Sequence, residues 1–221
     1  MKLCIDTYLR TGQHYRVVDI GSRISAGQTA THRDLLAGYD CTITGVDVLE
    51  GRNVDIVMRK PYRLPLKSNS ADVIISGQAF EHIPFFWASF LEMARVLAPG
   101  GLIFLTAPSR GHVHDRMDCW RYYPDSMRAL AAFARLKLKE AHTDMPPRKP
   151  GTVRFDYVHI DDTNYYWGDT VGVFQKPQSY SKLVAVAREV IVWWANRVGG
   201  IEHVPETTPR TARRNVLRTP A

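Results

Sequence analysis

Cysteines are few in this chain, and their positions exclude two common roles. Cys4, Cys41 and Cys119 are odd in number and far apart, so they fit neither a disulfide framework nor a zinc-binding spacing. No internal repeats or low-complexity tracts are evident; 45% of the residues are hydrophobic and 23% are charged. This composition is typical of a globular protein whose 221 residues bury one substantial core.

The start of the chain has no long apolar run. Asp6 and Arg10 interrupt the opening "MKLCIDTYLR" before an apolar segment of signal-peptide length is complete. We therefore expect no signal peptide and a cytoplasmic location.

Acidic residues are outnumbered, which raises the question of an anionic partner. The formal net charge is +7, with small basic clusters at 59–63 and 210–214. The other basic residues are scattered and no nucleic-acid-binding motif accompanies them, so nucleic acid is not the favoured partner.

The end of the chain predicts a helix and a tail. The pattern over 178–200 is helical and ends at two glycines, while Lys182 and Arg188 argue against a membrane span. We expect this helix to pack on the core or on a second subunit, which would form a homo-oligomer. Residues 201–221 are expected to form a flexible tail.

Short apolar runs alternate with helix-compatible segments, which predicts an α/β fold with helices on both faces of a doubly wound, mostly parallel sheet. Two helices are expected, at 84–98 and at 124–136. The seven expected strands are at 16–20, 41–47, 54–58, 71–77, 101–108 and 137–141, with the last within 165–177.

Two strand ends carry residues suited to a nucleoside. Asp19 and Gly21 follow the first strand, and Asp47 ends the second. Neighbouring strand ends in a doubly wound sheet meet at one crevice, where a carboxylate can accept hydrogen bonds from both ribose hydroxyls.

These features, followed by "EHI" at 81–83 and "RVLAPGG" at 95–101, resemble class I S-adenosylmethionine-dependent methyltransferases. The resemblance covers about residues 16–141 and implies a Rossmann-like methyltransferase domain over 1–177. It also implies S-adenosylmethionine as the methyl donor. The cofactor-binding residues implied are Asp19, Gly21, Ser22, Arg23, Asp47, Gln78 and Glu81.

Two departures from the family pattern affect this assignment. Arg23 and Ser25 stand where the family usually has glycines, and we interpret Arg23 as a candidate partner of the cofactor carboxylate. The acidic residue that often binds the adenine amino group has no evident counterpart in 58–65.

The segment 108–124 is rich in histidine, aspartate, arginine and aromatic residues, and the topology places it at the carboxyl ends of the strands. It resembles a segment of bacterial sugar and glycan O-methyltransferases, which implies a small saccharide acceptor. Transfer to a hydroxyl needs a base, and histidine suits this role near neutral pH. Our candidates, in order, are His114, His112 and His82, with Asp115 or Asp118 orienting a ring.

Other functions remain open at this point. His112 and His114 alternate on an extended segment and fit metal binding, but no recognised spacing supplies a third ligand, so a metal is not favoured. The aromatic side chains of Trp120 and Tyr122 suit either a sugar or the core. The alternatives to an O-methyltransferase are an N-methyltransferase acting on nucleic acid or a small metabolite, and a non-catalytic cofactor-binding subunit.

Overall fold

One mixed sheet organises the protein. The computed structural model describes residues 1–25, 27–111, 113, 114, 117–144, 151, 167–179 and 182–199. Within them the strand order is β3-β2-β1-β4-β5-β7-β6. The strands are β1 (Tyr15–Ile20), β2 (Cys41–Asp47), β3 (Ile56–Val57), β4 (Ala71–Gly77), β5 (Leu97–Arg110), β6 (Lys137–Thr143) and β7 (Gly168–Gln175).

The sheet is parallel except at one strand. β1 pairs in parallel with both β2 and β4, and β7 runs antiparallel to its neighbours β5 and β6. The expected doubly wound, mostly parallel, seven-stranded sheet is therefore confirmed. The order of the strands reverses between β1 and β4, which is where such sheets bind ligands.

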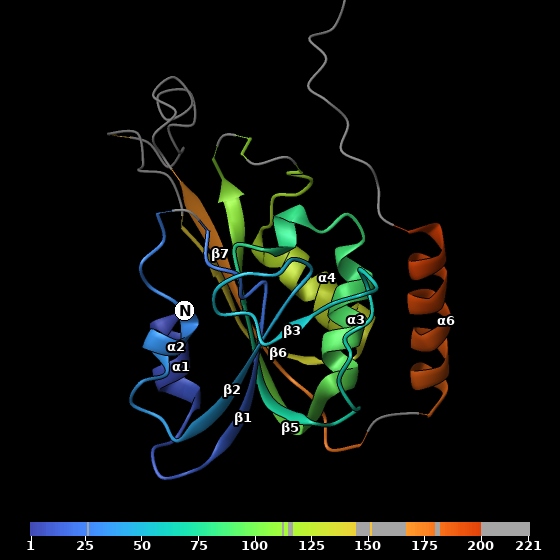
Figure 1. The fold of residues 1–221 in the computed structure, drawn as a ribbon, viewed down its shortest axis with the longest axis horizontal. Coiled ribbons are helices and arrows are strands. Elements are labelled where there is room, and N and C mark those ends of the chain that lie inside the picture. Colours follow the sequence, from blue (N-terminus) through green and yellow to red (C-terminus); the bar gives the residue numbers. More distant parts are fainter. Residues whose placement is uncertain are drawn as a thin grey trace, which may run out of the picture.

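Helices cover both faces of the sheet (Figure 1). On one side lie α1 and α2, and on the other lie α3, α4 and α6. Their bounds are α1 (Lys2–Tyr8), α2 (His32–Leu35), α3 (Phe86–Val96), α4 (Pro124–Ala134) and α6 (Lys182–Val198), and a 3-10 turn, η1, spans Phe80–His82.

The hydrophobic core has two layers because neighbouring strand residues point to opposite faces. Val17 and Val73 pack in the layer under α1, whereas Val18 and Ile74 pack in the layer under α3 and α4. Central strands buried on both sides require nearly continuous apolar sequence, and "VIIS" at 73–76 supplies it.

The main helix is shorter than the expected 84–98. Pro84 lies before the helix, whose N-cap is Phe85, and Leu97 already has an extended backbone as the first residue of β5. β3 is likewise reduced to two residues from the expected 54–58. The side chain of Asp55 accepts a hydrogen bond from the backbone amide of Gly45, and the backbone amide of Asp55 donates to the carbonyl of Gly45.

α6 packs against α3 by one side only. Val192 and Ala195 are buried, while the apolar side chains of Leu183, Val186 and Trp193 are exposed. A second subunit on this stripe stays a prediction, and the expected tail over 201–221 lies outside the described residues. Of the described helices, none pairs the length with the hydrophobicity that a membrane span requires.

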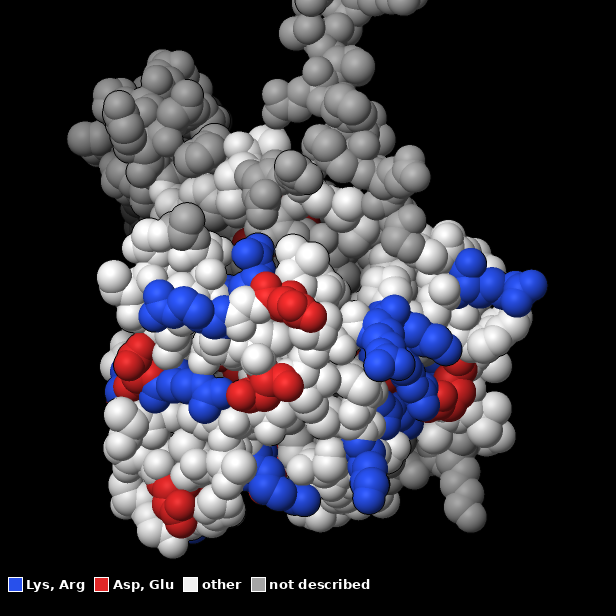
Figure 2. All heavy atoms as spheres, viewed as in Figure 1, with Lys and Arg blue, Asp and Glu red and all other residues white. Residues whose placement is uncertain are grey.

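Basic side chains on the face of Figure 2 form several separate groups, some of them beside acidic residues. Ion pairs of this kind include Arg16 with Asp72 and Arg33 with Asp55. The cluster at 210–214 lies outside the described residues.

Candidate functional site

A cavity of about 670 Å³ opens at the carboxyl ends of β1, β2 and β4. This size is ordinary for a small-molecule or cofactor site. Five residues expected at the active site line it, namely Gly21, Arg23, Asp47, Gln78 and His82. The cavity is not lined by four other residues that were expected at the active site and that the structure describes, namely Asp19, Ser22, Glu81 and His114.

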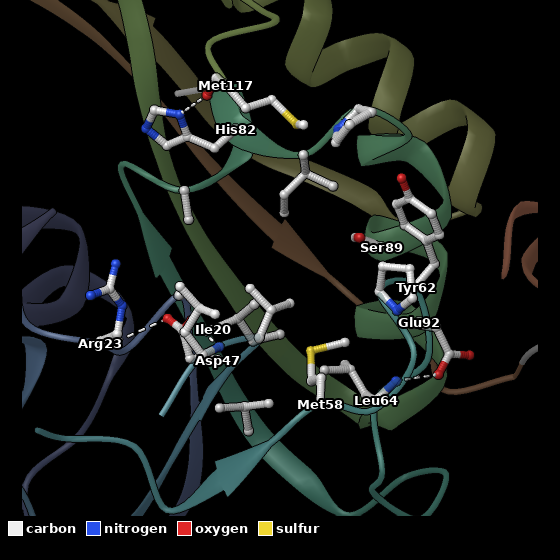
Figure 3. Close-up of a pocket in the computed structure, with 18 of the residues that line it drawn as sticks. Ile20, Arg23, Asp47, Met58, Tyr62, Leu64, His82, Ser89, Glu92 and Met117 are labelled. Atoms are coloured by element: carbon white, nitrogen blue, oxygen red, sulfur yellow. Dashed lines mark hydrogen bonds between the residues drawn. The ribbon is translucent and has the colours of Figure 1, made fainter. Parts of the chain in front are cut away.

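Asp47 occupies the position expected of a ribose-binding carboxylate. One of its oxygens accepts a hydrogen bond from the backbone amide of Arg23 at 3.1 Å, and the other accepts one from Leu49 at 3.0 Å (Figure 3). These bonds fix the carboxylate at the cavity wall. Each carboxylate oxygen has a further lone pair, so two hydroxyls of a sugar can still bind.

The turn after β1 requires glycine at position 21. The φ of Gly21 is +75°, which L-residues rarely adopt, and an added Cβ would lie 2.5 Å from the Cβ of Ala79. The amide of Gly21 donates to the carbonyl of Val46 and so joins this turn to β2. The backbone therefore comes close to the cavity without side-chain obstruction.

The side chain of Arg23 lies over Gly51, at whose missing Cβ the Cγ of Arg23 would be 2.7 Å away. Arg23 is exposed and lines the cavity. Its contact with a cofactor carboxylate stays a prediction. Ser22 differs, because its hydroxyl is buried and has no hydrogen-bond partner within the described part of the chain.

Asp19 faces α2 instead of the cavity. Its side chain is 2% exposed, and an oxygen lies 2.7 Å from Nδ1 of His32. His32 is not predictable from the sequence, because "THRD" at 31–34 matches no motif and the pairing joins residues 13 positions apart.

Apolar side chains line the part of the cavity after β3. Met58 and Leu64 lie there together with Glu92, a carboxylate that the sequence analysis missed. Glu92 is not a free acceptor, since it accepts hydrogen bonds from Arg95 and from the amide of Leu64.

Three hydrogen bonds fasten the segment 108–124, the predicted acceptor segment, to η1 and the residues just after it. The amide of Cys119 donates to the carbonyl of Glu81 at 2.7 Å, and the indole of Trp120 donates to Pro84 at 3.1 Å. The hydroxyl of Tyr122 donates to Phe80 at 2.9 Å. Tyr122 is buried, so it belongs to the core, whereas Trp120 remains partly exposed.

The same fastening brings His114 beside His82. Their ring centroids are 4.8 Å apart, and the Nε2 atoms lie 3.9 Å and 3.6 Å from Oε1 of Glu81, respectively. Two of the three histidines predicted as bases therefore adjoin one carboxylate. His112, the third, and Asp115 lie outside the described residues.

Asp118 orients His114. One of its oxygens lies 3.0 Å from Nδ1 of His114 and also accepts that residue's amide, while Arg121 binds both carboxylate oxygens. Burial alone would raise the pKa of Asp118, but the hydrogen bonds from Arg121 and the His114 amide lower it to about 2. Asp118 is therefore ionised at neutral pH, as an orienting group should be.

Burial has the opposite effect on Glu81. Its side chain is 0% exposed, and burial raises the pKa of its carboxyl group above the usual range. Its own backbone N–H and, less strongly, the positive charge of Arg121 act against this rise.

Residues after β4 and before β7 complete this region. Gln78 has a φ of 53°, a conformation that costs free energy and often marks a functional site. The side-chain amide of Gln78 donates to a carboxylate oxygen of Asp169 at 3.0 Å, and the indole of Trp167 donates to the same oxygen. The Trp167 ring lies 4.9 Å from that of His114, a contact between distant segments that the sequence did not reveal.

These residues fit a methyl-donor nucleoside. The close backbone at Gly21 and the carboxylate of Asp47 adjoin an apolar section that suits a purine. Gln78 and His82 lie on the side of the cavity that leads toward His114.

Residues 18–105 match the family model of a methyltransferase domain. A segment of 67 residues is 37% identical to an uncharacterised methyltransferase of Mycobacterium bovis (strain BCG / Pasteur 1173P2), covering 28% of this chain. That segment spans 26% of the relative's own length.

Solved structures share the fold at low sequence identity. A SAM-dependent methyltransferase of Methanosarcina mazei aligns with a TM-score of 0.55 at 13% identity, covering 80% of this chain and 98% of the other. The [4+2]-cyclase SpnF aligns with a TM-score of 0.58 at 15% identity, covering 80% and 79%. The fold alone thus does not determine the reaction. Residues 18–105 thus resemble a methyltransferase domain, and the solved structures show its fold.

Proposed function

We propose that the protein transfers the methyl group of S-adenosylmethionine to a hydroxyl of a small acceptor, a sugar or glycan precursor. The observation that carries this proposal is the contact of His82, which lines the cavity, with His114 of the acceptor segment. A hydroxyl is a poor nucleophile, and a nearby group that takes its proton as the new bond forms removes this obstacle.

Bound in the cavity, S-adenosylmethionine supplies an electrophilic methyl group on a sulfonium. Asp47 holds the ribose, and the turn at Gly21 admits the donor close to the backbone. Asp118 accepts a hydrogen bond from Nδ1–H of His114, which leaves the lone pair of the neutral ring on Nε2. Nε2 is therefore the atom that receives the proton of the acceptor hydroxyl. His114 therefore remains our first choice among the candidate bases.

Aromatic side chains support a sugar as the acceptor. Trp167 lies edge-on to His114, and Trp120 is exposed by 38% on the segment that carries His114. Sugars commonly pack their C–H faces against such rings, because a ring offers apolar area at a low entropic cost.

The test is formation of S-adenosylhomocysteine with a panel of saccharide, amine and RNA acceptors. We expect turnover with hydroxylated acceptors and a 10²- to 10⁴-fold lower kcat for His114→Ala, the usual size of a general-base effect. Binding of S-adenosylhomocysteine should be unchanged, because His114 is not a lining residue of the cavity. The control is His142→Ala, which removes an exposed histidine on β6.

Turnover of amines or RNA alone would show that the acceptor is wrong and would favour an N-methyltransferase. Cofactor binding without turnover of any acceptor would favour the non-catalytic subunit.

A further inference from the structure

The buried carboxylate of Glu81 has no hydrogen-bond partner among the described residues. Neither oxygen has one, although the side chain is 0% exposed. An unpaired buried carboxylate is costly, and native proteins usually satisfy such a group with a proton, a water or an ion.

Both neighbouring histidines direct the same kind of atom toward Glu81. Nδ1 of His82 is bonded to the carbonyl of Met117, which only accepts, so this Nδ1 carries the ring proton. Nδ1 of His114 lies 3.0 Å from a carboxylate oxygen of Asp118, and both oxygens of Asp118 accept hydrogen bonds from Arg121, so this Nδ1 is also the donor. In the neutral rings, each Nε2 is therefore a lone-pair atom.

Three electron-pair donors thus surround one point. The Nε2 atoms lie 3.6 Å and 3.9 Å from Oε1 of Glu81, and the ligand atoms of all three residues are within 4.8 Å of one another. Ligands on a tetrahedral zinc ion at bond lengths of about 2.0–2.1 Å are roughly 3.3 Å apart. Small rotations of the side chains would close the set around an ion.

We propose that Glu81, His82 and His114 bind a divalent transition-metal ion of the zinc type. Two imidazoles and one carboxylate form a ligand set known from catalytic zinc sites, which keep one further position open. Mg²⁺ prefers oxygen ligands and fits this set poorly.

The surroundings of the three residues also suit a metal. Ligating histidines almost always donate their second ring N–H to a carbonyl or carboxylate, as His82 does to Met117 and His114 does to Asp118. His82 also lines the cavity, so an ion bound by these residues would lie beside it.

This inference rests on the proposed function and changes its proton step. With the ion in place, Nε2 of His114 is a ligand and no longer the base. The acceptor hydroxyl binds the ion, which lowers the pKa of that hydroxyl, and its proton passes to solvent water. The oxygen then forms the O–CH₃ bond as the S–CH₃ bond breaks, and the electron pair of that bond stays on sulfur.

The site is tested by metal binding, without any acceptor present. After treatment with EDTA and dialysis, the full-length chain is titrated with Zn²⁺ by calorimetry and with Co²⁺ by visible absorption. We expect one ion per chain, a tetrahedral Co²⁺ spectrum and no binding of Mg²⁺. Glu81→Gln, which keeps the shape of the side chain, and His114→Ala should each weaken Zn²⁺ binding at least tenfold.

The matched control uses a second group of the same residue types, formed by Cys4, Glu140 and His142. Glu140→Gln should bind Zn²⁺ like the wild type, since Glu140 already accepts a hydrogen bond from Tyr8 and pairs with His142, which is exposed to solvent. Thermal melting shows whether each variant is folded. The proposal is overturned if the wild type binds no Zn²⁺, or if folded Glu81→Gln binds it as tightly as the wild type does.

The role of the ion is separated from the proposed function by assaying methyl transfer before and after EDTA. Loss of turnover after EDTA and its return with Zn²⁺ support the inference. Equal turnover before and after EDTA would agree with the proposed methyl transfer and would overturn the role of the ion in it. If the titrations show that the chain binds Zn²⁺ but no acceptor is methylated with or without the ion, only the proposed function is contradicted.

Discussion

Asp19, at the end of β1, forms a hydrogen-bonded pair with His32 of α2, and the two atoms concerned are 2.7 Å apart. The carboxylate is almost fully buried and the imidazole is 20% exposed. The pair joins β1 to α2, which follows the turn at Gly21 in the chain. Its effect on the cavity is therefore indirect, through the position of that segment.

Replacing His32 should destabilise the fold. His32→Ala leaves a buried carboxylate unpaired, which should lower the free energy of unfolding by roughly 2–4 kcal/mol. The control is His14→Ala, which breaks the exposed pair of His14 with Asp40 and should cost less than about 0.5 kcal/mol. Urea unfolding of both variants measures the difference, and equal losses would mean that burial of Asp19 does not matter.

Removing the Asp47 carboxylate should weaken cofactor binding. Asp47→Ala loses the proposed acceptor for the ribose hydroxyls, and bonds to a charged group contribute about 1.5–3 kcal/mol. We expect S-adenosylhomocysteine to bind roughly 10- to 100-fold more weakly by calorimetry. Asp125→Ala, whose side chain is 95% exposed at the start of α4, should bind like the wild type. Unchanged affinity for Asp47→Ala would refute the ribose assignment.

A methyl group at position 21 should block the cavity as well as strain the turn. Gly21→Ala meets the Cβ of Ala79 at 2.5 Å, whereas Gly12→Ala, at a similar φ of +81°, meets no atom within 4 Å. Both variants should lose about 1 kcal/mol from the backbone conformation, and Gly21→Ala a further 1–3 kcal/mol from overpacking. Thermal melts and cofactor titrations of the two variants separate these effects. A Gly12→Ala variant that is as unstable as Gly21→Ala would contradict the clash.

Lys176 should make stability depend on pH. Burial, with smaller contributions from Arg188 and Arg95, lowers the pKa of Lys176 from 10.5 to about 8. The unfolded chain then binds more protons than the folded one between about pH 8 and 10.5, so the free energy of unfolding should rise with pH in this window.

The measurement is urea unfolding of the wild type and of Lys176→Gln from pH 7 to 10. The wild type should gain roughly 1–3 kcal/mol relative to the variant as the pH rises. The exposed-lysine control Lys67→Gln should follow the wild type at every pH. A constant difference between the wild type and Lys176→Gln would count against a lowered pKa.

The sheet was largely predictable because burial on both faces constrains the sequence of each central strand. The apolar runs "VVDI" at 17–20 and "VIISG" at 73–77 are typical of central strands that are buried on both faces of a parallel sheet. Helix ends were less predictable. The helix expected over 84–98 ends at Val96, because its last residues join β5 through pairing with β4.

The sequence by itself determined the fold class, the turn at Gly21 and the position of Asp47 at the end of β2, since these depend on local pattern and on the meeting of strand ends. Only the tertiary structure decided that Asp19 pairs with His32 and that the buried Glu81 lies beside both His82 and His114. Such contacts join segments 13 to 33 positions apart, and no local preference encodes them. The contact of Glu81 with His114 arises because the backbone hydrogen bond from Cys119 and the side chain of Tyr122 hold the acceptor segment against η1.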